Sequence, residues 1–110
     1  MPMSSPHDPV LDAPPGQPVV LPGRGEPDLT LWVHEAGADA DPALPAVVFS
    51  HGFPELGYSW RYQLPAVAAA GFRCVAPDQR GYGRSSTYTR YEDFRQELIV
   101  EDMLELLASL

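Results

Sequence analysis

Lysine is absent from this 110-residue sequence, and acidic residues outnumber basic ones by 15 to 7, for a formal net charge of −8 at pH 7. Residues 1–45 hold seven acids and one arginine, Arg24, whereas residues 46–110 hold eight acids and six arginines. Nucleic acid is therefore a poor candidate partner, because contacts to phosphate need clustered bases. Most of the excess acidity lies in the N-terminal part, where it favours solubility rather than binding.

Cysteine is nearly absent, and no hydrophobic run is long enough to cross a membrane. The one cysteine, Cys74, lies in an apolar segment, which excludes a disulfide or a cysteine-based zinc site within the chain and predicts a buried, inert thiol. The N-terminus lacks a basic segment followed by an apolar one, so it does not resemble a signal peptide. We expect a soluble, cytoplasmic protein with no membrane partner, no metal and no cofactor.

Proline is abundant but unevenly placed, with ten of the 13 prolines in the first 45 residues. Residues 1–16 combine proline, serine, aspartate and glycine with little apolar sequence, which predicts a flexible tail. The rest of the chain, residues 17–110, is expected to form a single folded unit.

Hydrophobic patterning predicts an α/β fold. Apolar and polar residues alternate over 19–21 and 29–35, which indicates a β-hairpin that leaves His34 half-exposed on the face opposite the leucines. The segments 46–50 (AVVFS) and 72–78 (FRCVAPD) are typical of strands buried on both faces.

The residues between these two segments, 59–71, have helical composition and end at Gly71, a suitable residue just past a helix end. Pro65 should kink that helix or begin a new first turn. Strand, helix and strand with short links predict a parallel pair with a right-handed crossover.

The last 20 residues, 91–110, predict a helix, in which Thr89 and Glu92 have the spacing of a capping box. Its apolar stripe consists of Phe94, Leu98, Ile99, Met103, Leu106, Leu107 and Leu110. Its opposite side, interpreted as a solvated face, carries Asp93, Glu97, Glu101 and Glu105.

Two loops follow the predicted parallel strands, at the edge where open α/β sheets bind ligands. In the first, His51-Gly52-Phe53-Pro54-Glu55, Gly52 allows a sharp turn and leaves the Phe53 N–H exposed, as an oxyanion hole requires. A cis peptide bond at Pro54 would aim this N–H into the cleft. The alternative is a plain strand-to-helix turn.

The second loop, residues 77–86 (PDQRGYGRSS), is predicted to be structural. Asp78 and Arg80 are expected to bond to the backbone or to each other, within a tight turn made by Gly81 and Gly83. A phosphate site is poorly supported, because no third glycine is in place and no helix follows at once.

Together, His51-Gly52-Phe53-Pro54-Glu55, Ser59-Trp60-Arg61 and the run 76–86 (APDQRGYGRSS) resemble the N-terminal part of α/β-hydrolase-fold enzymes, and within them most closely the epoxide hydrolases. The resemblance covers residues 17–110. Haloalkane dehalogenases and some ester or carbon–carbon hydrolases share the same frame and remain alternatives.

The resemblance implies that an aspartate attacks an epoxide carbon, and that a histidine-activated water hydrolyses the resulting ester. It implies that the Phe53 N–H is one oxyanion donor, that Phe53 and Trp60 line the pocket, and that His51 is a structural hydrogen-bonding residue. The substrate of the full-length enzyme would be a small apolar epoxide, with no cofactor and no metal.

The nucleophile that this resemblance implies is not among the 110 residues, because they contain no Gly-x-[Ser/Asp]-x-Gly elbow. His7 and His34 match no catalytic position of the family. One hypothesis is that the chain is the N-terminal part of an epoxide hydrolase, with an incomplete sheet in which the segment 46–50 is an open edge. The other is that it is a non-catalytic product. On either hypothesis we expect the isolated chain to be marginally stable and inactive.

Overall fold

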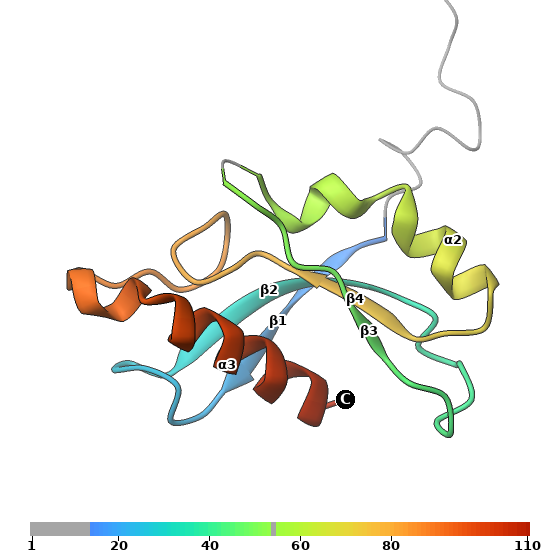
Figure 1. The fold of residues 1–110 in the computed structure, drawn as a ribbon, viewed down its shortest axis with the longest axis horizontal. Helices are drawn as coiled ribbons and strands as arrows, with labels where there is room; N and C mark the ends of the chain where they lie inside the picture. Colours follow the sequence, from blue (N-terminus) through green and yellow to red (C-terminus); the bar gives the residue numbers. More distant parts are fainter. Residues whose placement is uncertain (1–13, 54) are drawn as a thin grey trace, which may run out of the picture.

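The computed structural model describes residues 14–53 and 55–110, which form one mixed β-sheet with helices on both faces (Figure 1). The strands, in the spatial order β1-β2-β4-β3, are β1 (Gly16–Leu21), β2 (Leu29–Ala36), β3 (Val47–Val48) and β4 (Cys74–Pro77). The helices are the 3₁₀ helix η1 (Gly57–Trp60), the α-helix α2 (Gln63–Ala69), the 3₁₀ helix η2 (Tyr91–Phe94) and the α-helix α3 (Gln96–Ala108). None of the described helices is long and apolar enough to span a membrane.

The pairing of the strands confirms the predicted hairpin and the predicted parallel pair. Strands β1 and β2 are antiparallel, in register from Gly16 opposite His34 to Leu21 opposite Leu29. Strand β4 lies between β2, to which it is antiparallel, and β3, to which it is parallel. Strand β3 therefore lies at the edge of the described sheet, as expected.

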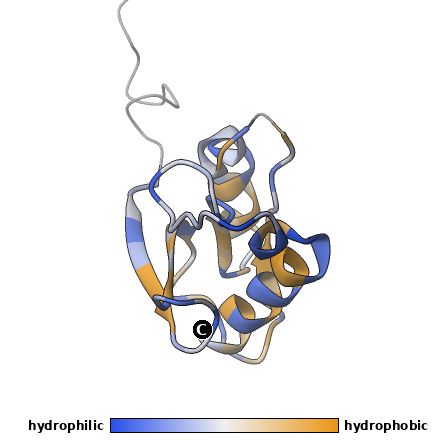
Figure 2. Cartoon of the chain, turned by 90° about the vertical axis from the view of Figure 1, so that its left-hand side faces the viewer, coloured by the Kyte–Doolittle hydropathy of each residue, from blue (hydrophilic) through white to orange (hydrophobic). Residues whose placement is uncertain are grey.

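The central strand β4 separates two hydrophobic cores because its side chains alternate between the faces of the sheet. On one face, Val75 packs with Met103 and Leu106 of α3 and with the inward side chains of β2. On the other face, Cys74 and Ala76 pack with Leu64 of α2 and its neighbours. Every residue of β4 is buried, as a strand covered on both faces should be. In Figure 2 the strands carry much of the hydrophobic colour.

Cys74 is fully buried, which confirms the prediction for this thiol. Its Sγ donates to the carbonyls of Leu64 and Ala36, at 3.3 and 3.6 Å. Burial raises the pKa of the thiol, so Cys74 stays protonated and unreactive in the folded chain.

Two predicted boundaries change in the structure. Residues 46–50 were expected to be buried on both faces, but β3 contains two residues, Val47 and Val48, and both are half-buried. The prediction is wrong for this strand because β3 has a neighbour on one side only. The predicted tail 1–16 is also too long, since Gly16 already pairs in β1; residues 1–13, His7 among them, lie outside the described part.

The first α-helix begins later than predicted, at Gln63, after the separate 3₁₀ helix η1. Pro65 falls in its first turn, where the missing N–H costs no helical hydrogen bond. Gly71 has a φ of 103° just past the helix end, as expected for a glycine that stops a helix.

The C-terminal helix also begins later than predicted. Arg95 has an extended backbone, with φ −62° and ψ 145°, and separates η2 from α3. Among the described residues, no side chain caps η2 or α3. The predicted capping box of Thr89 and Glu92 is therefore wrong, because Thr89 precedes the 3₁₀ helix η2 and Glu92 lies within it, before the first turn of α3.

The apolar stripe of this helix is confirmed at its centre, where Met103 and Leu106 are buried. At its ends Phe94 and Leu110 are 37% and 36% exposed. On the opposite side the predicted glutamates are exposed, whereas Asp93 belongs to η2 and is half-buried.

Asp102 is a fully buried acid within the apolar side of α3, and it forms a bidentate ion pair with Arg80. The Arg80 Nε and Nη2 donate to its two oxygens at 2.6 and 2.7 Å. Arg80, itself 2% exposed, also donates to the carbonyls of Asp93 and Arg24, each at 2.9 Å. The Arg24 side chain adds bonds to Asp102 at 3.2 Å and Glu101 at 3.1 Å. Arg80 was expected to bond to the backbone or to Asp78; it bonds to backbone carbonyls, but its ionic partner is on α3.

Replacing Asp102 with asparagine should destabilise the chain by about 3–5 kcal/mol, because Arg80 would remain buried without a carboxylate. Urea unfolding followed by circular dichroism measures the change. The matched control is Glu105→Gln, which alters an exposed carboxylate on the same helix and should cost less than about 0.5 kcal/mol. Equal effects of the two changes would contradict the central role of the buried pair.

Candidate functional site

The two predicted loops lie at the same end of the sheet (Figure 1). Residues 51–57 follow β3 and residues 78–86 follow β4. Because β3 and β4 are parallel, both loops extend from carboxyl ends of strands. This is the edge where ligands bind in open α/β sheets.

His51 is buried, 4% exposed, and hydrogen-bonds with both ring nitrogens. Its Nε2 lies 3.0 Å from the backbone N of Gln79, and its Nδ1 lies 3.0 Å from the carbonyl oxygen of Gly52. A backbone N–H can only donate, so Nε2 is the acceptor and the ring proton belongs on Nδ1, which donates to the carbonyl. The edge of the ring also contacts Tyr82, with centroids 4.7 Å apart. His51 thus has the surroundings of a structural hydrogen-bonding residue.

The peptide unit between Gly52 and Phe53 is fixed by two hydrogen bonds that its carbonyl oxygen accepts. The Gly52 oxygen accepts from His51 and, at 2.8 Å, from the N–H of Glu55. A trans peptide unit is planar, so its N–H points away from its C=O, and holding one fixes the direction of the other. Within the part of the chain that the structure describes, the Phe53 N–H has no acceptor. It is therefore a donor whose direction is fixed by the hydrogen bonds at the Gly52 carbonyl.

The side chains of this loop agree less well with the sequence prediction. The Phe53 ring is 84% exposed. Gly52 has no positive φ, and a methyl group added there would meet only the Glu55 carboxylate, at 3.7 Å. Gly52 was expected to allow a sharp turn, and in the structure neither its backbone conformation nor the space around it demands glycine. Pro54, and with it the predicted cis bond, lies outside the described residues.

Trp60 was predicted to line a pocket, and it is half-buried in the core on the α2 side. Its ring packs on Phe49, with centroids 5.0 Å apart. Its Nε1 is buried and has no partner among the described residues. Trp60 therefore packs in the core beside Phe49, and its place as a pocket wall stays a prediction.

Asp78 is buried, 3% exposed, and organises both loops through hydrogen bonds to backbone. Its Oδ1 accepts from the N–H of Gly57 at 2.8 Å and its Oδ2 from the N–H of Arg84 at 3.3 Å. Its own carbonyl accepts from the Ser85 hydroxyl at 2.5 Å. The carboxylate thus orients the backbone of its neighbours, in agreement with the structural role predicted for it.

The two glycines of the second loop are required by their surroundings. Gly81 and Gly83 have φ of 84° and 51°, where larger residues are strained. A Cβ on Gly83 would lie 2.2 Å from the Asp78 carboxylate, and one on Gly81 would lie 2.5 Å from the Phe94 ring. The turn therefore brings its backbone against Asp78 as the sequence predicts.

Gln79, which the sequence analysis did not single out, joins the two loops. Its side-chain Nε2 donates to the His51 carbonyl at 2.6 Å and to the Ser50 hydroxyl at 2.7 Å. A polar residue directly after a buried strand, at the edge where ligands bind, is the signal that could have identified it.

One cavity of about 510 Å³ borders both loops through Leu56 and Gly83. His34 and Tyr58 line it, and His34 is half-buried as predicted, with its Nδ1 donating to the Pro14 carbonyl at 2.9 Å. Among the described residues, no group of three His, Cys, Asp or Glu side chains could hold a metal.

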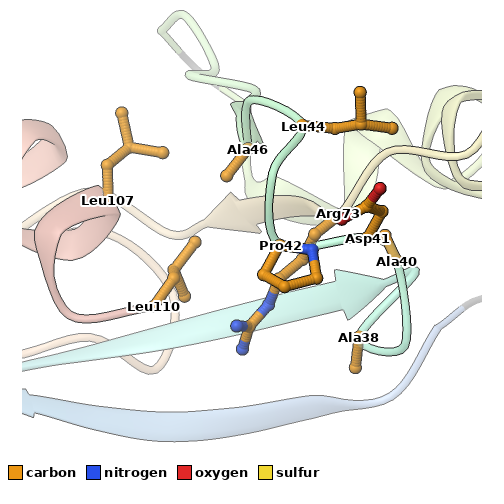
Figure 3. A pocket seen from close by; sticks show the side chains of 9 residues that line it. All are labelled: Ala38, Ala40, Asp41, Pro42, Leu44, Ala46, Arg73, Leu107 and Leu110. Atoms are coloured by element: carbon orange, nitrogen blue, oxygen red, sulfur yellow. The ribbon is translucent and has the colours of Figure 1, made fainter.

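A second cavity, of about 430 Å³, lies at the opposite end of the parallel strands (Figure 3). Figure 3 shows Leu107 of α3 and the C-terminal Leu110 on one side and the loop 38–46 on the other. It is lined by Ala38, Ala40, Asp41, Pro42, Leu44, Ala46, Arg73, Leu107 and Leu110. Ala46 and Arg73 precede β3 and β4, so this cavity lies at the amino ends of the strands, away from both loops.

Comparison with known proteins identifies a matching family model and several similar proteins. A family model described as the alpha/beta hydrolase fold matches residues 45–110. Epoxide hydrolase A of Mycobacterium tuberculosis is 49% identical over 77 residues, which make up 70% of this chain and 23% of that protein. Bifunctional epoxide hydrolase 2 of Rattus norvegicus is 50% identical over 85 residues, 77% of this chain and 14% of that protein.

A solved structure, Epoxide Hydrolase A from Mycobacterium thermoresistibile, matches with a TM-score of 0.71 and 38% identity, over 86% of this chain and 28% of its own. This chain spans about a quarter or less of the length of the curated relatives named above.

Replacing Asp78 with alanine should destabilise the chain by about 3 kcal/mol, because the N–H groups of Gly57 and Arg84 lose a charged acceptor. Urea unfolding gives the energy, and amide hydrogen exchange should show faster exchange at these two positions. Asp39→Ala, which removes an exposed carboxylate, is the control and should leave both quantities unchanged. Protection of Gly57 that survives in Asp78→Ala would refute this account of the carboxylate.

Proposed function

The chain belongs to the α/β hydrolase fold family, and on that basis we propose that it is the N-terminal part of an epoxide hydrolase. The whole enzyme converts a small apolar epoxide to a diol through a carboxylate ester. Residues 17–110 contribute the first part of the hydrolase domain, including one arm of the oxyanion hole. This arm consists of residues 50–53, and its reactive group is the Phe53 N–H.

The observation that carries the proposal is the Phe53 N–H, held in a fixed direction at the carboxyl end of β3 and free of any acceptor among the described residues. An oxyanion donor must be in place before charge develops, because a donor that has to reorganise during the reaction contributes less. Support for epoxide rather than other substrates comes from the relatives, which are named epoxide hydrolases at about half identity.

The chemistry has two steps. In the first, a carboxylate of the enzyme attacks one epoxide carbon, the carbon–oxygen bond breaks, and the released alkoxide takes a proton from a hydroxyl donor of the enzyme that lies outside these 110 residues. In the second, an activated water attacks the ester carbonyl, whose oxygen becomes an oxyanion that the Phe53 N–H stabilises. Collapse of this intermediate frees the diol and restores the carboxylate. The attacking carboxylate and the base that activates water come from outside these 110 residues.

His51 and Asp78 serve the second step without touching substrate. His51 holds the Gly52 carbonyl and so sets the direction of the Phe53 N–H. Asp78 fixes the start of η1 through Gly57, on the far side of the arm. The Phe53 ring, exposed in this chain, and Trp60, half-buried beside Phe49, are walls of the pocket in the whole enzyme.

The whole protein encoded by the reading frame should convert styrene oxide to its diol, whereas the 110-residue chain alone should form none, because it contributes one oxyanion donor without a nucleophile. Product is quantified by chromatography. 1-Chlorobutane is tested in parallel, since haloalkane dehalogenases share this frame. Chloride release without diol formation would replace the epoxide proposal. A stop directly after Leu110, with no elbow encoded downstream, would favour a non-catalytic product.

Removing the Phe53 N–H should slow ester hydrolysis by about 10²–10³-fold, as for other oxyanion donors. An ester bond in place of the Gly52–Phe53 amide removes the N–H and leaves the Phe53 side chain intact. Single-turnover kinetics should show the alkyl-enzyme ester accumulating in this variant. Phe53→Ala retains the N–H and is the matched control, which should change KM far more than the rate of hydrolysis. Equal hydrolysis rates with and without the N–H would exclude Phe53 as a donor.

A further inference from the structure

We infer that Gln79 is the positioning residue of the oxyanion arm: it holds residues 50–53 in place and selects the histidine tautomer that directs the Phe53 N–H. The inference rests on the proposed function for its kinetic consequence. Its structural part, the control of one peptide unit by Gln79, stands on the contacts alone.

Residues 50–53, the oxyanion arm, need hydrogen bonds from elsewhere because β3, the strand before them, is short and lies at the sheet edge. Strand β3 has two residues and one neighbouring strand, so few ladder hydrogen bonds reach residues 50–53. Gln79 supplies the missing contacts from the end of β4, a strand buried on both faces. Its amide group donates at 2.6 Å to the His51 carbonyl and at 2.7 Å to the Ser50 hydroxyl.

The chemistry of these two contacts suits glutamine. Both partners, a carbonyl and a hydroxyl oxygen, accept hydrogen bonds, and a side-chain NH₂ has two hydrogens with which to serve both. A glutamate of the same length would present only acceptors to them. A methionine would fill similar space with no donor at all.

The backbone of Gln79 acts on the arm by a second route. Its N–H donates to His51 Nε2 at 3.0 Å, so this nitrogen must carry no proton. The ring proton then lies on Nδ1, which donates to the Gly52 carbonyl at 3.0 Å. The other tautomer would set Nε2–H against the Gln79 N–H and leave Gly52 without this donor.

The influence of Gln79 on the direction of the Phe53 N–H passes through one peptide unit, the one between Gly52 and Phe53. The Gly52 carbonyl and the Phe53 N–H share one plane, and the carbonyl already accepts bonds from His51 and Glu55. Hydrogen bonds at the oxygen polarise the amide and make its N–H a stronger donor. Gln79 therefore acts on the reacting atoms through His51 and Gly52 and touches none of them itself.

The first test is nuclear magnetic resonance of the 110-residue chain. The ¹⁵N shifts of the His51 ring should show the Nδ1–H tautomer, and relaxation of the Phe53 amide should show a rigid N–H. In Gln79→Met the Phe53 amide should become mobile while the His51 tautomer persists, because the backbone donor is unchanged. Gln63→Met, on the exposed start of α2, is the control and should alter neither signal.

The second test is steady-state kinetics of the whole protein on styrene oxide. Gln79→Met should lower kcat by about 10–100-fold and lower KM along with it, because slower hydrolysis lets the alkyl-enzyme ester accumulate while kcat/KM, which reports ring opening, stays nearly unchanged. Gln79→Glu should lower kcat further, since a carboxylate there faces the His51 carbonyl.

The outcomes separate this inference from the proposed function. No turnover by the unaltered whole protein would defeat the proposed function, and the mobility of the Phe53 amide would still decide the role of Gln79. An unchanged Phe53 amide in Gln79→Met, or an unchanged kcat beside an active parent, would overturn the inference. So would global unfolding of Gln79→Met, because Gln79 would then support the whole fold and not one arm.

Discussion

The buried pair of Arg80 and Asp102 is the constraint on which the rest of the arrangement depends. It joins the loop after β4 to the middle of α3, and Arg24 extends it to the turn between β1 and β2. Burying two charges is costly unless nearly every donor and acceptor is satisfied. Here four hydrogen bonds leave the Arg80 guanidinium, two to carboxylate and two to backbone carbonyls. The pair thus places α3 on the sheet in one position.

The candidate site depends on the loop after β4, which the Arg80–Asp102 pair holds rigidly. At the far end of the same loop, the Ser85 and Ser86 hydroxyls accept from the N–H groups of Trp32 and Thr30 at 2.8 Å, which ties the loop to β2. With both ends held, Asp78 and the residue after it can act as fixed points for the neighbouring loop. A short edge strand such as β3 could not hold a catalytic donor by its own ladder.

The two loops differ in how many hydrogen bonds hold them, because one follows a central strand and the other follows an edge strand. The loop after β4 is dense with internal hydrogen bonds because its strand is central and its glycines let the backbone close around Asp78. In the loop after β3, the Phe53 N–H has no acceptor among the described residues. The loop after β4 is therefore the more constrained of the two, and it supplies hydrogen bonds that hold the loop after β3.

Much of this could be predicted from the sequence, because the relevant signals are local. Alternation over 29–35 identifies a strand, a continuous apolar run before Asp78 identifies a buried one, and His-Gly-Phe-Pro-Glu marks a loop at the ligand-binding edge. Asp102 was within reach too, since it stands four residues from both Leu98 and Leu106 on the apolar side of the helix. Its position showed that it would be buried, but not what would neutralise it.

The hydrogen-bond and ion-pair partners of the key polar residues were decided by the tertiary structure alone. Arg80 and Arg24 are 22 and 78 residues from Asp102, and the amide of Gln79 reaches a carbonyl 28 residues away. The half-burial of β3 also depends on which strands flank it and not on its own apolar composition. Periodicity reports the environment of a residue within a few positions of chain. A buried charge or an aligned N–H is instead stabilised by groups that only the folded chain brings together, and this is why the sequence determined the elements and the fold determined the site.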